Sequence, residues 1–199
     1  MAKNQSANRR TKVVVIVGPT ASGKSSLGIF LARKFNGEII SADSRQVYRG
    51  MDIGTGKVSK DVSQDKHGRV YLASGVRHYL IDVVSPKKQF TADDFKKLGE
   101  KAIKEIAKKG KIPIVVGGTG FYIDVLLGRM SVAEVPPNKK LRAELEKQSA
   151  EQLFKMLLKL DLKRAKTIDR HNKRRLIRAL EILKITGKPI PPLQTSKKY

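Results

Sequence analysis

The feature that most constrains this chain is a glycine-rich run between a predicted strand and a predicted helix. The run, Gly18-Pro-Thr-Ala-Ser-Gly-Lys-Ser25, follows the apolar stretch 13–17 and precedes a helical pattern over 26–35. Such a run is typical of a phosphate-binding loop, in which backbone N–H groups and the positive end of the helix surround phosphate oxygens. The alternative is a chance glycine turn, and both flanks argue against it. The sequence therefore predicts that the chain binds a polyphosphate.

Every residue of this loop is a candidate for binding phosphate. The predicted diphosphate- or nucleotide-binding residues are Gly18, Pro19, Thr20, Ala21, Ser22, Gly23, Lys24 and Ser25. We expect the Lys24 ammonium group to bind the terminal phosphates, and the Ser25 hydroxyl to ligate Mg²⁺ between phosphate oxygens. The loop does not name a reaction, because kinases, NTPases and transferases with pyrophosphate-bearing donors use the same arrangement.

The residue types narrow the kind of site further. The chain has no cysteine, which excludes disulfides and thiolate zinc sites, and its three histidines (His67, His78, His171) are scattered. Mg²⁺ is therefore the only metal that we expect. No apolar run approaches transmembrane length, and the polar first 12 residues lack the apolar stretch of a signal peptide. We expect a cytoplasmic protein with no membrane partner.

The charge of the chain is strongly positive. It carries 42 Lys and Arg against 18 Asp and Glu, a formal net charge of +24. Half of the excess lies in residues 129–199, which hold 19 basic and 7 acidic side chains. This balance favours a polyanionic partner, first of all nucleic acid and much less an anionic membrane. The alternative is a lysine-rich solvated surface without a partner.

The first two thirds of the chain alternate between strand and helix patterns. Predicted strands lie at 13–17, 38–42, 78–84 and 112–116, with helices over 26–35, over 91–109 and after the run 117–120. This order predicts an α/β fold of the P-loop NTPase type, a parallel sheet with helices on both faces. Residues 50–77 show no clear period and are predicted to be a loop or lid. Asp43 ends a strand at the sheet edge where ligands bind, whereas Asp82 is either a magnesium-positioning carboxylate or a turn residue.

A small helical insertion is predicted to follow residues 136–137. Amphipathic helices are expected over 139–148, 149–160 and 172–186. We therefore predict a mobile basic N-terminus (1–11), a P-loop core (12–128), a helical insertion subdomain (129–171), and a return helix with a C-terminal tail (172–199). The last helix begins with the cations Lys173, Arg174, Arg175 and Arg178. Cations oppose the helix dipole at this end, which favours a polyanion lying there over simple solvated charge.

Several blocks of the sequence, in this order, resemble the bacterial tRNA dimethylallyltransferase family, also called tRNA isopentenyltransferases. They are the loop 18–25, Ile40-Ser-Ala-Asp-Ser-Arg-Gln-Val-Tyr48, Gly50-Met-Asp-Ile-Gly-Thr55, His78-Tyr-Leu-Ile-Asp82, Val115-Val-Gly-Gly-Thr-Gly-Phe-Tyr122 and Arg174-Arg-Leu-Ile-Arg-Ala-Leu-Glu181. The resemblance runs from about residue 12 to residue 195. Known members continue well past residue 199, so the chain resembles a C-terminally shortened member, either a fragment or a reduced form.

The resemblance implies transfer of a dimethylallyl group from dimethylallyl diphosphate to N6 of an adenine next to the anticodon. It implies catalytic roles for Asp43 as the base, for Thr119 near the reacting centre, and for Lys24 at the departing diphosphate. Its implied tRNA-binding residues are Asp43, Ser44, Arg45, Gln46, Arg174, Arg175, Leu176, Ile177 and Arg178. An exocyclic amine that attacks an allylic carbon needs a base, and the leaving pyrophosphate needs cations.

The implied partners are dimethylallyl diphosphate and the anticodon stem-loop of tRNA, with Mg²⁺ as cofactor and the protein acting as a monomer. Two other functions stay open at this point. One is that of a P-loop kinase or nucleotide-binding ATPase, and the other is that of a catalytically inactive RNA-binding remnant of the family. Protection by Mg-ATP, rather than by the prenyl diphosphate, would indicate the first; RNA binding without turnover would indicate the second.

Overall fold

The computed structural model describes residues 11–61, 70–130, 133 and 135–189. The chain divides into two compact units, Met1–Arg129 and Met130–Tyr199. The predicted basic N-terminus, residues 1–11, lies outside the described residues except for Thr11, and so does the tail from residue 190. In the part of the chain that is described, no helix has the length and apolar character that crossing a bilayer requires.

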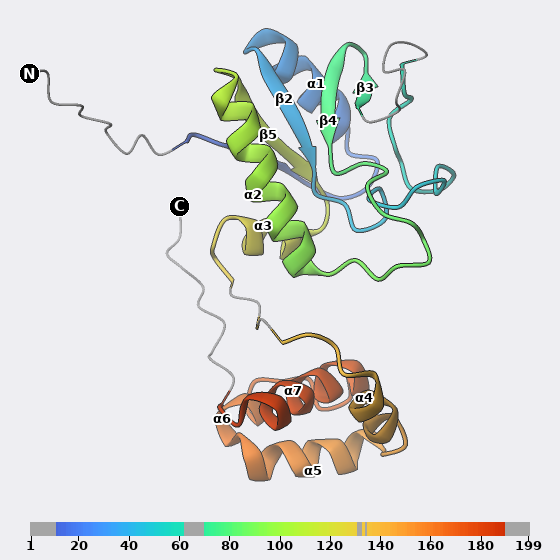
Figure 1. The fold of residues 1–199 in the computed structure, drawn as a ribbon, viewed down its shortest axis with the longest axis vertical. Helices are drawn as coiled ribbons and strands as arrows, with labels where there is room; N and C mark the ends of the chain where they lie inside the picture. The colour runs from blue at the N-terminus through green and yellow to red at the C-terminus, as the bar shows by residue number, and fades with distance from the viewer. Residues whose placement is uncertain (1–10, 62–69, 131–132, 134, 190–199) are drawn as a thin grey trace, which may run out of the picture. The chain divides into compact units, whose positions relative to one another are not determined.

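The described residues of the first unit form a five-stranded sheet with the order β1-β5-β2-β4-β3. The strands are β1 (Val14–Val17), β2 (Gly37–Ser41), β3 (Tyr71–Ala73), β4 (Val76–Tyr79) and β5 (Ile112–Gly117). In this sheet order, the neighbouring strands β1, β5, β2 and β4 are parallel to one another, and the edge strand β3 is antiparallel to β4. The predicted α/β fold is confirmed, but the sheet is mixed rather than wholly parallel (Figure 1).

The antiparallel strand lies in the segment that the sequence analysis assigned to a loop or lid. Ser74 and Gly75 both have positive φ angles, 53° and 72°, which is the conformation of a two-residue type I′ hairpin turn. The carboxylate of Asp61 accepts hydrogen bonds from both of their backbone N–H groups, at 2.8 and 2.7 Å. The prediction of a loop was therefore wrong for residues 71–77, where two very short strands pair with each other.

Helices cover both faces of the sheet, as predicted. Helix α1 (Lys24–Lys34) packs on one face, and α2 (Ala92–Lys108) with α3 (Gly120–Leu126) packs on the other (Figure 1). Helix α2 begins with a capping box, in which Thr91 and Asp94 satisfy each other's backbone N–H groups. Its Phe95 is buried and stacks on Tyr122 of α3 with a centroid separation of 4.4 Å.

Two parallel strands approach each other closely at the carboxyl edge of the sheet. Strands β2 and β5 pair from Gly37↔Ile112 to Ser41↔Val116. Just beyond, a Cβ atom on Gly117 would lie 2.2 Å from the carbonyl oxygen of Ala42, a distance no side chain can occupy. Glycine at this position therefore allows the two strand ends, and the residues after them, to come together.

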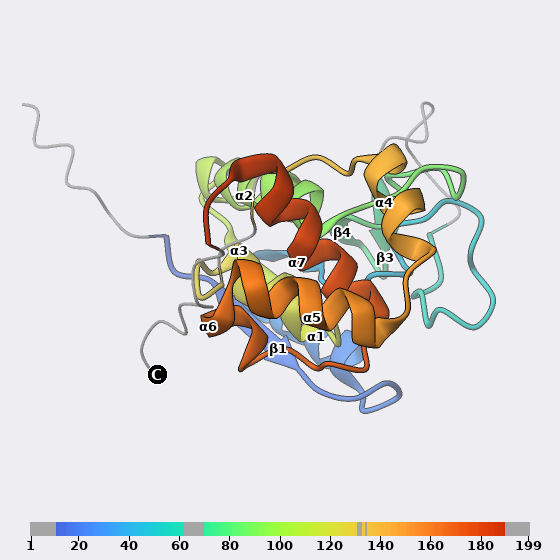
Figure 2. The ribbon, with the colours of Figure 1, turned by 90° about the horizontal axis from the view of Figure 1, so that it is seen from below.

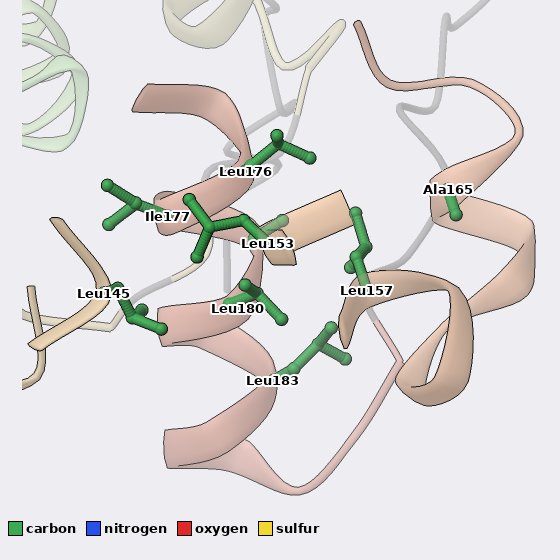
Figure 3. Packing of buried hydrophobic residues seen from close by; sticks show 9 residues of the cluster. Leu145, Leu153, Leu157, Ala165, Leu176, Ile177, Leu180 and Leu183 are labelled. Atoms are coloured by element: carbon green, nitrogen blue, oxygen red, sulfur yellow. The ribbon is translucent and has the colours of Figure 1, made fainter. Parts of the chain in front are cut away.

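The second unit is helical, with α4 (Lys139–Glu146), α5 (Ala150–Leu160), the short α6 (Leu162–Ala165) and α7 (Lys173–Thr186) among its described residues. Helices α5 and α7 lie side by side (Figure 2). Their leucines Leu153, Leu157, Leu176 and Leu180 are fully buried in one core (Figure 3). The predicted helices are confirmed, and α6 was not predicted. Because α7 shares this core, residues 173–186 are part of the same unit as the helices before them rather than a separate return segment.

Candidate active site

A cavity of about 250 Å³ lies at the carboxyl edge of the sheet. Its walls come from segments far apart in the sequence: Thr20–Ser26 of the glycine-rich loop, Asp43 and Gln46 after β2, Thr55 and Gly56, and Val116–Gly118 at the end of β5. This is the edge at which open α/β sheets bind ligands. The cavity therefore joins the predicted phosphate loop to the predicted base.

The backbone of the loop is shaped to present N–H groups. Ala21 and Gly23 have positive φ angles, 63° and 80°, and Gly23 is the N-cap of α1. No side chain caps this helix start, and its first turn holds no acidic residue. The backbone N–H groups of the first turn thus remain for a ligand, and the helix dipole favours an anion there.

The Lys24 side chain folds back over the loop. Its Nζ donates a hydrogen bond to the Pro19 carbonyl oxygen and another, of 3.3 Å, to the Ser22 hydroxyl. The positive charge is therefore held within the loop, on the side that lines the cavity. A phosphate oxygen that enters the loop offers this ammonium group a charged acceptor in place of two neutral ones.

Asp43 lies on the cavity wall in a fixed orientation. Its Oδ1 accepts hydrogen bonds from the backbone N–H groups of Arg45, at 2.8 Å, and Gln46, at 3.3 Å. This local turn is typical of aspartate at the end of a strand. The side chain is half-buried, and the described residues provide no partner for its second oxygen. One carboxylate oxygen is thus left to accept a proton.

Thr119 is joined to the same strand end. Its backbone N–H donates to the Ala42 carbonyl at 3.1 Å, and its Oγ1 accepts from the backbone N–H of Ser44 at 3.1 Å. These bonds hold Thr119 beside the strand end that is followed by Asp43. The Thr119 hydroxyl does not line the cavity; its contact in the structure is with the main chain of Ser44.

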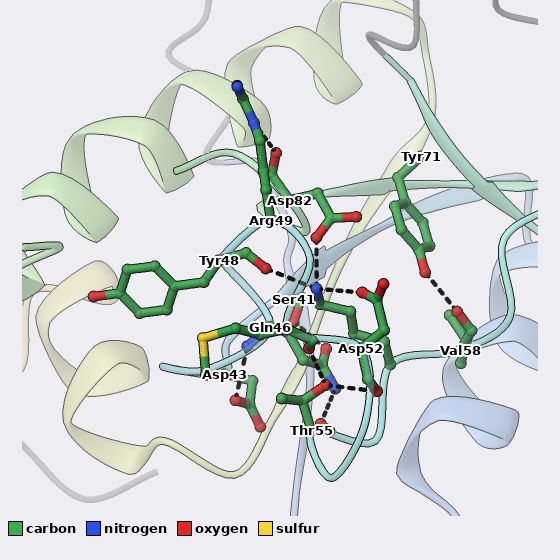
Figure 4. A network of polar contacts seen from close by, with 12 residues as sticks. Ser41, Asp43, Gln46, Tyr48, Arg49, Asp52, Thr55, Val58, Tyr71 and Asp82 are labelled. Carbon is green, nitrogen blue, oxygen red and sulfur yellow. Dashed lines mark hydrogen bonds and ion pairs between the residues drawn. The ribbon is translucent and has the colours of Figure 1, made fainter. Parts of the chain in front are cut away.

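Gln46 is hydrogen-bonded to a part of the cavity wall that is distant from it in the sequence (Figure 4). Its Oε1 accepts from the Ser41 hydroxyl at 2.8 Å, and its Nε2 donates to the carbonyl oxygens of Thr55 and Gly56, both at 3.1 Å. Both Nε2 protons are therefore occupied. Gln46 was assigned to tRNA binding together with Ser44 and Arg45. Ser44 and Arg45 are exposed, whereas the side chain of Gln46 is hydrogen-bonded within the protein.

A buried lysine close to the cavity was not predicted from the sequence. Lys57 Nζ lies 2.5 Å from Oδ1 of Asp82, so this carboxylate has a cationic partner within the protein. Burial lowers the pKa of Lys57, but hydrogen bonds to Asp82 and Asp52 outweigh it and hold that pKa above its ordinary value. No local pattern signals this pair, because its two members are 25 residues apart.

A magnesium ion fits the donor set only together with a phosphate ligand. The described residues contain no group of three or more His, Cys, Asp or Glu side chains that would hold a metal by themselves. The Ser25 hydroxyl lines the cavity at the helix start. Mg²⁺ bound by one hydroxyl and by substrate phosphates needs no more from the protein than this.

The basic start of α7 divides into residues with different surroundings. Asn172 caps the helix by accepting from the backbone N–H of Arg175, at 3.1 Å. Lys173 pairs with Glu146, at 3.5 Å. The side chains of Arg174 and Arg175 are exposed and have no partner in the described part of the chain. These two arginines remain candidates for RNA contact.

Two further residues of the implied RNA surface are core residues instead. Leu176 is 0% exposed and Ile177 is 4% exposed, and both belong to the core of the helical unit. Both side chains are packed inside this core, so they do not reach the surface. The assignment of these two side chains to tRNA binding is therefore corrected.

Arg178 belongs to a network around a buried carboxylate. Glu181 is 0% exposed and is bound by Arg178 at 2.6 Å, by Arg142 at 2.8 Å and by the Asn138 backbone N–H at 2.7 Å. Burial raises the pKa of Glu181, but these hydrogen bonds outweigh it and lower the pKa to about 2. Arg178 also donates to the Val135 carbonyl at 2.9 Å. The positive charge of Arg178, which the sequence suggested would meet a polyanion, is balanced by Glu181 within the protein.

Comparisons with known proteins agree on one family. A family model described as IPP transferase matches residues 46–199. The chain is 43% identical over 183 residues to the tRNA dimethylallyltransferase of Thermoanaerobacter sp. (strain X514), covering 90% of this chain and 55% of the relative. The tRNA dimethylallyltransferase of Pediococcus pentosaceus is also 43% identical, over 187 residues, covering 92% and 57%.

Solved structures show the same likeness. The full-length tRNA isopentenylpyrophosphate transferase from Bacillus halodurans is 41% identical with a TM-score of 0.56, covering 90% of this chain and 57% of that one. A eukaryotic dimethylallyltransferase acting on tRNA is 35% identical with a TM-score of 0.71, covering 90% and 43%. The chain thus spans about half the length of the curated relatives it matches.

Proposed function

Because the chain belongs to the IPP transferase family, we propose that it transfers a dimethylallyl group from dimethylallyl diphosphate to N6 of an adenine beside the anticodon of tRNA. The observation that carries this proposal is that the phosphate loop and the half-buried carboxylate of Asp43 line one cavity. A loop that only bound a nucleotide would not need a base in the same cavity. The names of the relatives support the prenyl donor and the tRNA acceptor.

In this proposal the loop binds the diphosphate of the donor. The backbone N–H groups of Thr20–Ser25 and the uncapped start of α1 surround its oxygens, and Lys24 adds a positive charge. The same groups bind the diphosphate more strongly as it departs, because negative charge grows on its oxygens when the C–O bond breaks. The loop thus both holds the donor and stabilises the leaving group.

Asp43 is the base in the proposed transfer. The N6 amine of adenine forms a bond to the allylic carbon as the bond from that carbon to the diphosphate breaks, and the amine then loses a proton. The backbone N–H groups of Arg45 and Gln46 hold Oδ1 of Asp43, which leaves Oδ2 to accept this proton. The adenine has to leave its stack to reach the cavity, as an anticodon-loop base is able to do.

Mg²⁺ is part of the proposal as the partner of Ser25. The metal would neutralise charge on the diphosphate and so favour its departure. Ser25 follows Lys24 at the first turn of α1, where its hydroxyl lines the cavity. The protein's own contribution is to present this hydroxyl and the neighbouring N–H groups to the phosphates.

For tRNA, the proposal uses two groups of exposed residues. Ser44 and Arg45 adjoin Asp43 in the first unit, and Arg174 and Arg175 begin α7 in the second. Arginine side chains without protein partners are suited to phosphates and to loop bases. We further propose that the anticodon stem-loop is the part of tRNA that binds, and that the protein acts as a cytoplasmic monomer.

The decisive experiment incubates the purified protein with unmodified tRNA, dimethylallyl diphosphate and Mg²⁺, followed by mass analysis of the nucleosides. We expect an adenosine that is heavier by one dimethylallyl group. Thermal shifts with dimethylallyl diphosphate and with Mg-ATP, measured in parallel, separate donor classes. Protection by Mg-ATP alone would indicate a kinase or ATPase, and tRNA binding without any product would indicate an inactive RNA-binding protein.

A further inference from the structure

The buried ammonium group of Lys57 is saturated with hydrogen bonds. The side chain is only 3% exposed, and Nζ donates to Oδ1 of Asp82 at 2.5 Å, to the Tyr48 carbonyl at 2.7 Å and to Oδ1 of Asp52 at 2.9 Å. An ammonium group has three protons, so each finds an acceptor. A buried charge is costly unless it is paired in this way, which makes the geometry around Lys57 specific.

The three acceptors come from three segments of the first unit. Asp82 follows β4, Tyr48 follows the turn after Asp43, and Asp52 lies in the loop 51–56. The carboxylates of Asp52 and Asp82 point toward a common centre between these segments (Figure 4). Tyr48 and Asp82 are already joined by neighbouring backbone bonds, since the Val83 and Val84 N–H groups donate to Val47. The segment whose position depends on Lys57 is therefore the loop 51–56.

This loop supplies one wall of the phosphate cavity. Thr55 and Gly56, the two residues that precede Lys57 in the sequence, line the cavity. Their carbonyl oxygens accept hydrogen bonds from Gln46. The loop is thus fastened from two sides, by a neutral amide on the cavity side and by a buried cation behind it. The side chain of Asp52 is 68% exposed, so its ion pair with Lys57 adds little to stability, but the pair joins the loop to the buried ammonium group.

We propose that Lys57 is a positioning residue of the donor site: its ammonium group fixes the loop 51–56, so that Thr55 and Gly56 close one side of the diphosphate cavity. The proposal rests on the proposed function only in naming a diphosphate as the ligand. Lys57 does not touch the cavity itself. It acts through the backbone of the two residues that precede it.

The test compares Lys57→Met, which keeps the length of the side chain and removes its charge, with Lys57→Arg, which keeps the charge. Lys88→Met is the matched control, because Lys88 is exposed and its side chain has no partner among the described residues. Three quantities are measured on the full chain: hydrogen exchange of the amides of residues 51–56, the affinity for inorganic pyrophosphate with Mg²⁺, and the KM and kcat for dimethylallyl diphosphate.

In Lys57→Met we expect faster exchange confined to residues 51–56, about 10-fold weaker pyrophosphate binding, and a donor KM raised about 10-fold with a much smaller change in kcat. Lys57→Arg should recover a large part of each effect, and Lys88→Met should match the wild type. Asp82→Asn provides a second variant should Lys57→Met not fold, because it removes the strongest acceptor but leaves a hydrogen-bonding oxygen. It should show the same pattern in weaker form.

A folded Lys57→Met variant with wild-type pyrophosphate affinity would overturn the proposal, even if its stability fell, because Lys57 would then be a structural residue only. A fall in kcat at unchanged KM would also overturn it. The proposed function fails differently: a wild-type protein that binds pyrophosphate but makes no prenylated nucleoside would refute the transfer, whereas the exchange and pyrophosphate measurements would still decide the role of Lys57.

Discussion

Helices α1 and α7 both begin with positive side chains, but the surroundings of these side chains differ. Helix α1 begins at Lys24 with a glycine N-cap and no side-chain cap, so its first backbone N–H groups have no partner in the helix. Helix α7 begins at Lys173 behind Asn172, whose side chain caps it, and Arg178 one turn later is bound to Glu181. The first start is open for an anion. The second is largely satisfied by the protein.

The comparison shows that the function of a cluster of cations cannot be inferred until the hydrogen-bond acceptors of these cations are known. At α1 the acceptors of Lys24 are neutral oxygens of its own loop, which a phosphate readily replaces. At α7 one arginine is committed to a buried carboxylate, and only Arg174 and Arg175 stay exposed and unpaired within the described residues. The variants below test whether this division into binding and structural cations is right.

The largest effect is expected at the carboxylate beside the open helix start. Asp43→Asn keeps the size and the turn of the side chain but removes its capacity to take a proton, so single-turnover prenyl transfer should fall ~10²-fold or more. Binding of dimethylallyl diphosphate and of tRNA should stay near the wild-type level. Rapid-quench measurement of the product checks this. Wild-type transfer by the variant would return Asp43 to the role of a turn residue.

The next effect concerns the cation at α1. Lys24→Ala removes the one charged side chain that the loop turns toward its own oxygens, and should weaken binding of the diphosphate by about 2 kcal/mol while slowing transfer. Calorimetric titration with dimethylallyl diphosphate measures the loss. The stability of the fold should change little, because the lysine gives up only two contacts to neutral oxygens. Equal donor affinity in the variant would remove the loop from the mechanism.

The corresponding variant at α7 should behave in the opposite way. Arg178→Gln leaves Glu181 with only Arg142 as a cationic partner and removes the bonds to the connecting segment, so the helical unit should lose about 1–2 kcal/mol of stability. Hydrogen exchange of the α7 amides reports this loss locally. Donor binding in the first unit should be unaffected. Unchanged exchange would show that Arg178 is a free surface cation after all, and would reopen its assignment to RNA.

Acid should expose the same network. The pKa of Glu181 is about 2 in the folded protein, below its ordinary 4.5. As the pH falls, this carboxylate is therefore protonated in the unfolded state before it is protonated in the folded state. Its contribution to stability is therefore complete above about pH 4.5 and is lost as the pH falls toward 2. We expect α7 amides to exchange progressively faster, relative to a pH-corrected reference, over this window. Glu181→Gln should be less stable at neutral pH and should lack this pH-dependent step.

Local patterns predicted a large part of this structure, because the interactions that decide them are local. The predicted helices over 91–109 and 149–160 begin at Thr91 and Ser149, and the structure confirms both starts with these residues as N-caps. The loop before α1 is recognisable for the same reason. The hairpin of β3 and β4 was missed because strands of three and four residues carry too little pattern. Lys57 was missed because its partner is distant in the sequence, and no period links them.

The residues of α7 show a conflict between two kinds of sequence signal. The amphipathic pattern of residues 172–186 favours a packed position for Leu176, whereas the family resemblance assigned this residue to RNA; the structure follows the amphipathic pattern. The pair Arg178 and Glu181 was visible as opposite charges three residues apart on a helix, a spacing that brings side chains together. What the sequence did not reveal is that Glu181 is fully buried, which makes the pair structural.

The smallest effect on the protein itself, and the sharpest on the comparison, is expected from replacing Arg174 and Arg175 together with Gln. Both are exposed, and neither has a partner in the described part of the chain, so stability should be unchanged or higher by a few tenths of a kcal/mol, because cations at a helix N-terminus oppose its dipole. If they contact tRNA phosphates, affinity should fall, and the slope of log affinity against log salt should become shallower by roughly two units. Lys184→Gln, near the end of the same helix, is the matched control for the loss of charge alone. Equal tRNA affinity and salt slope in the double variant would mean that the start of α7 does not bind tRNA, and of the two helix starts compared only the open start of α1 would then bind an anion.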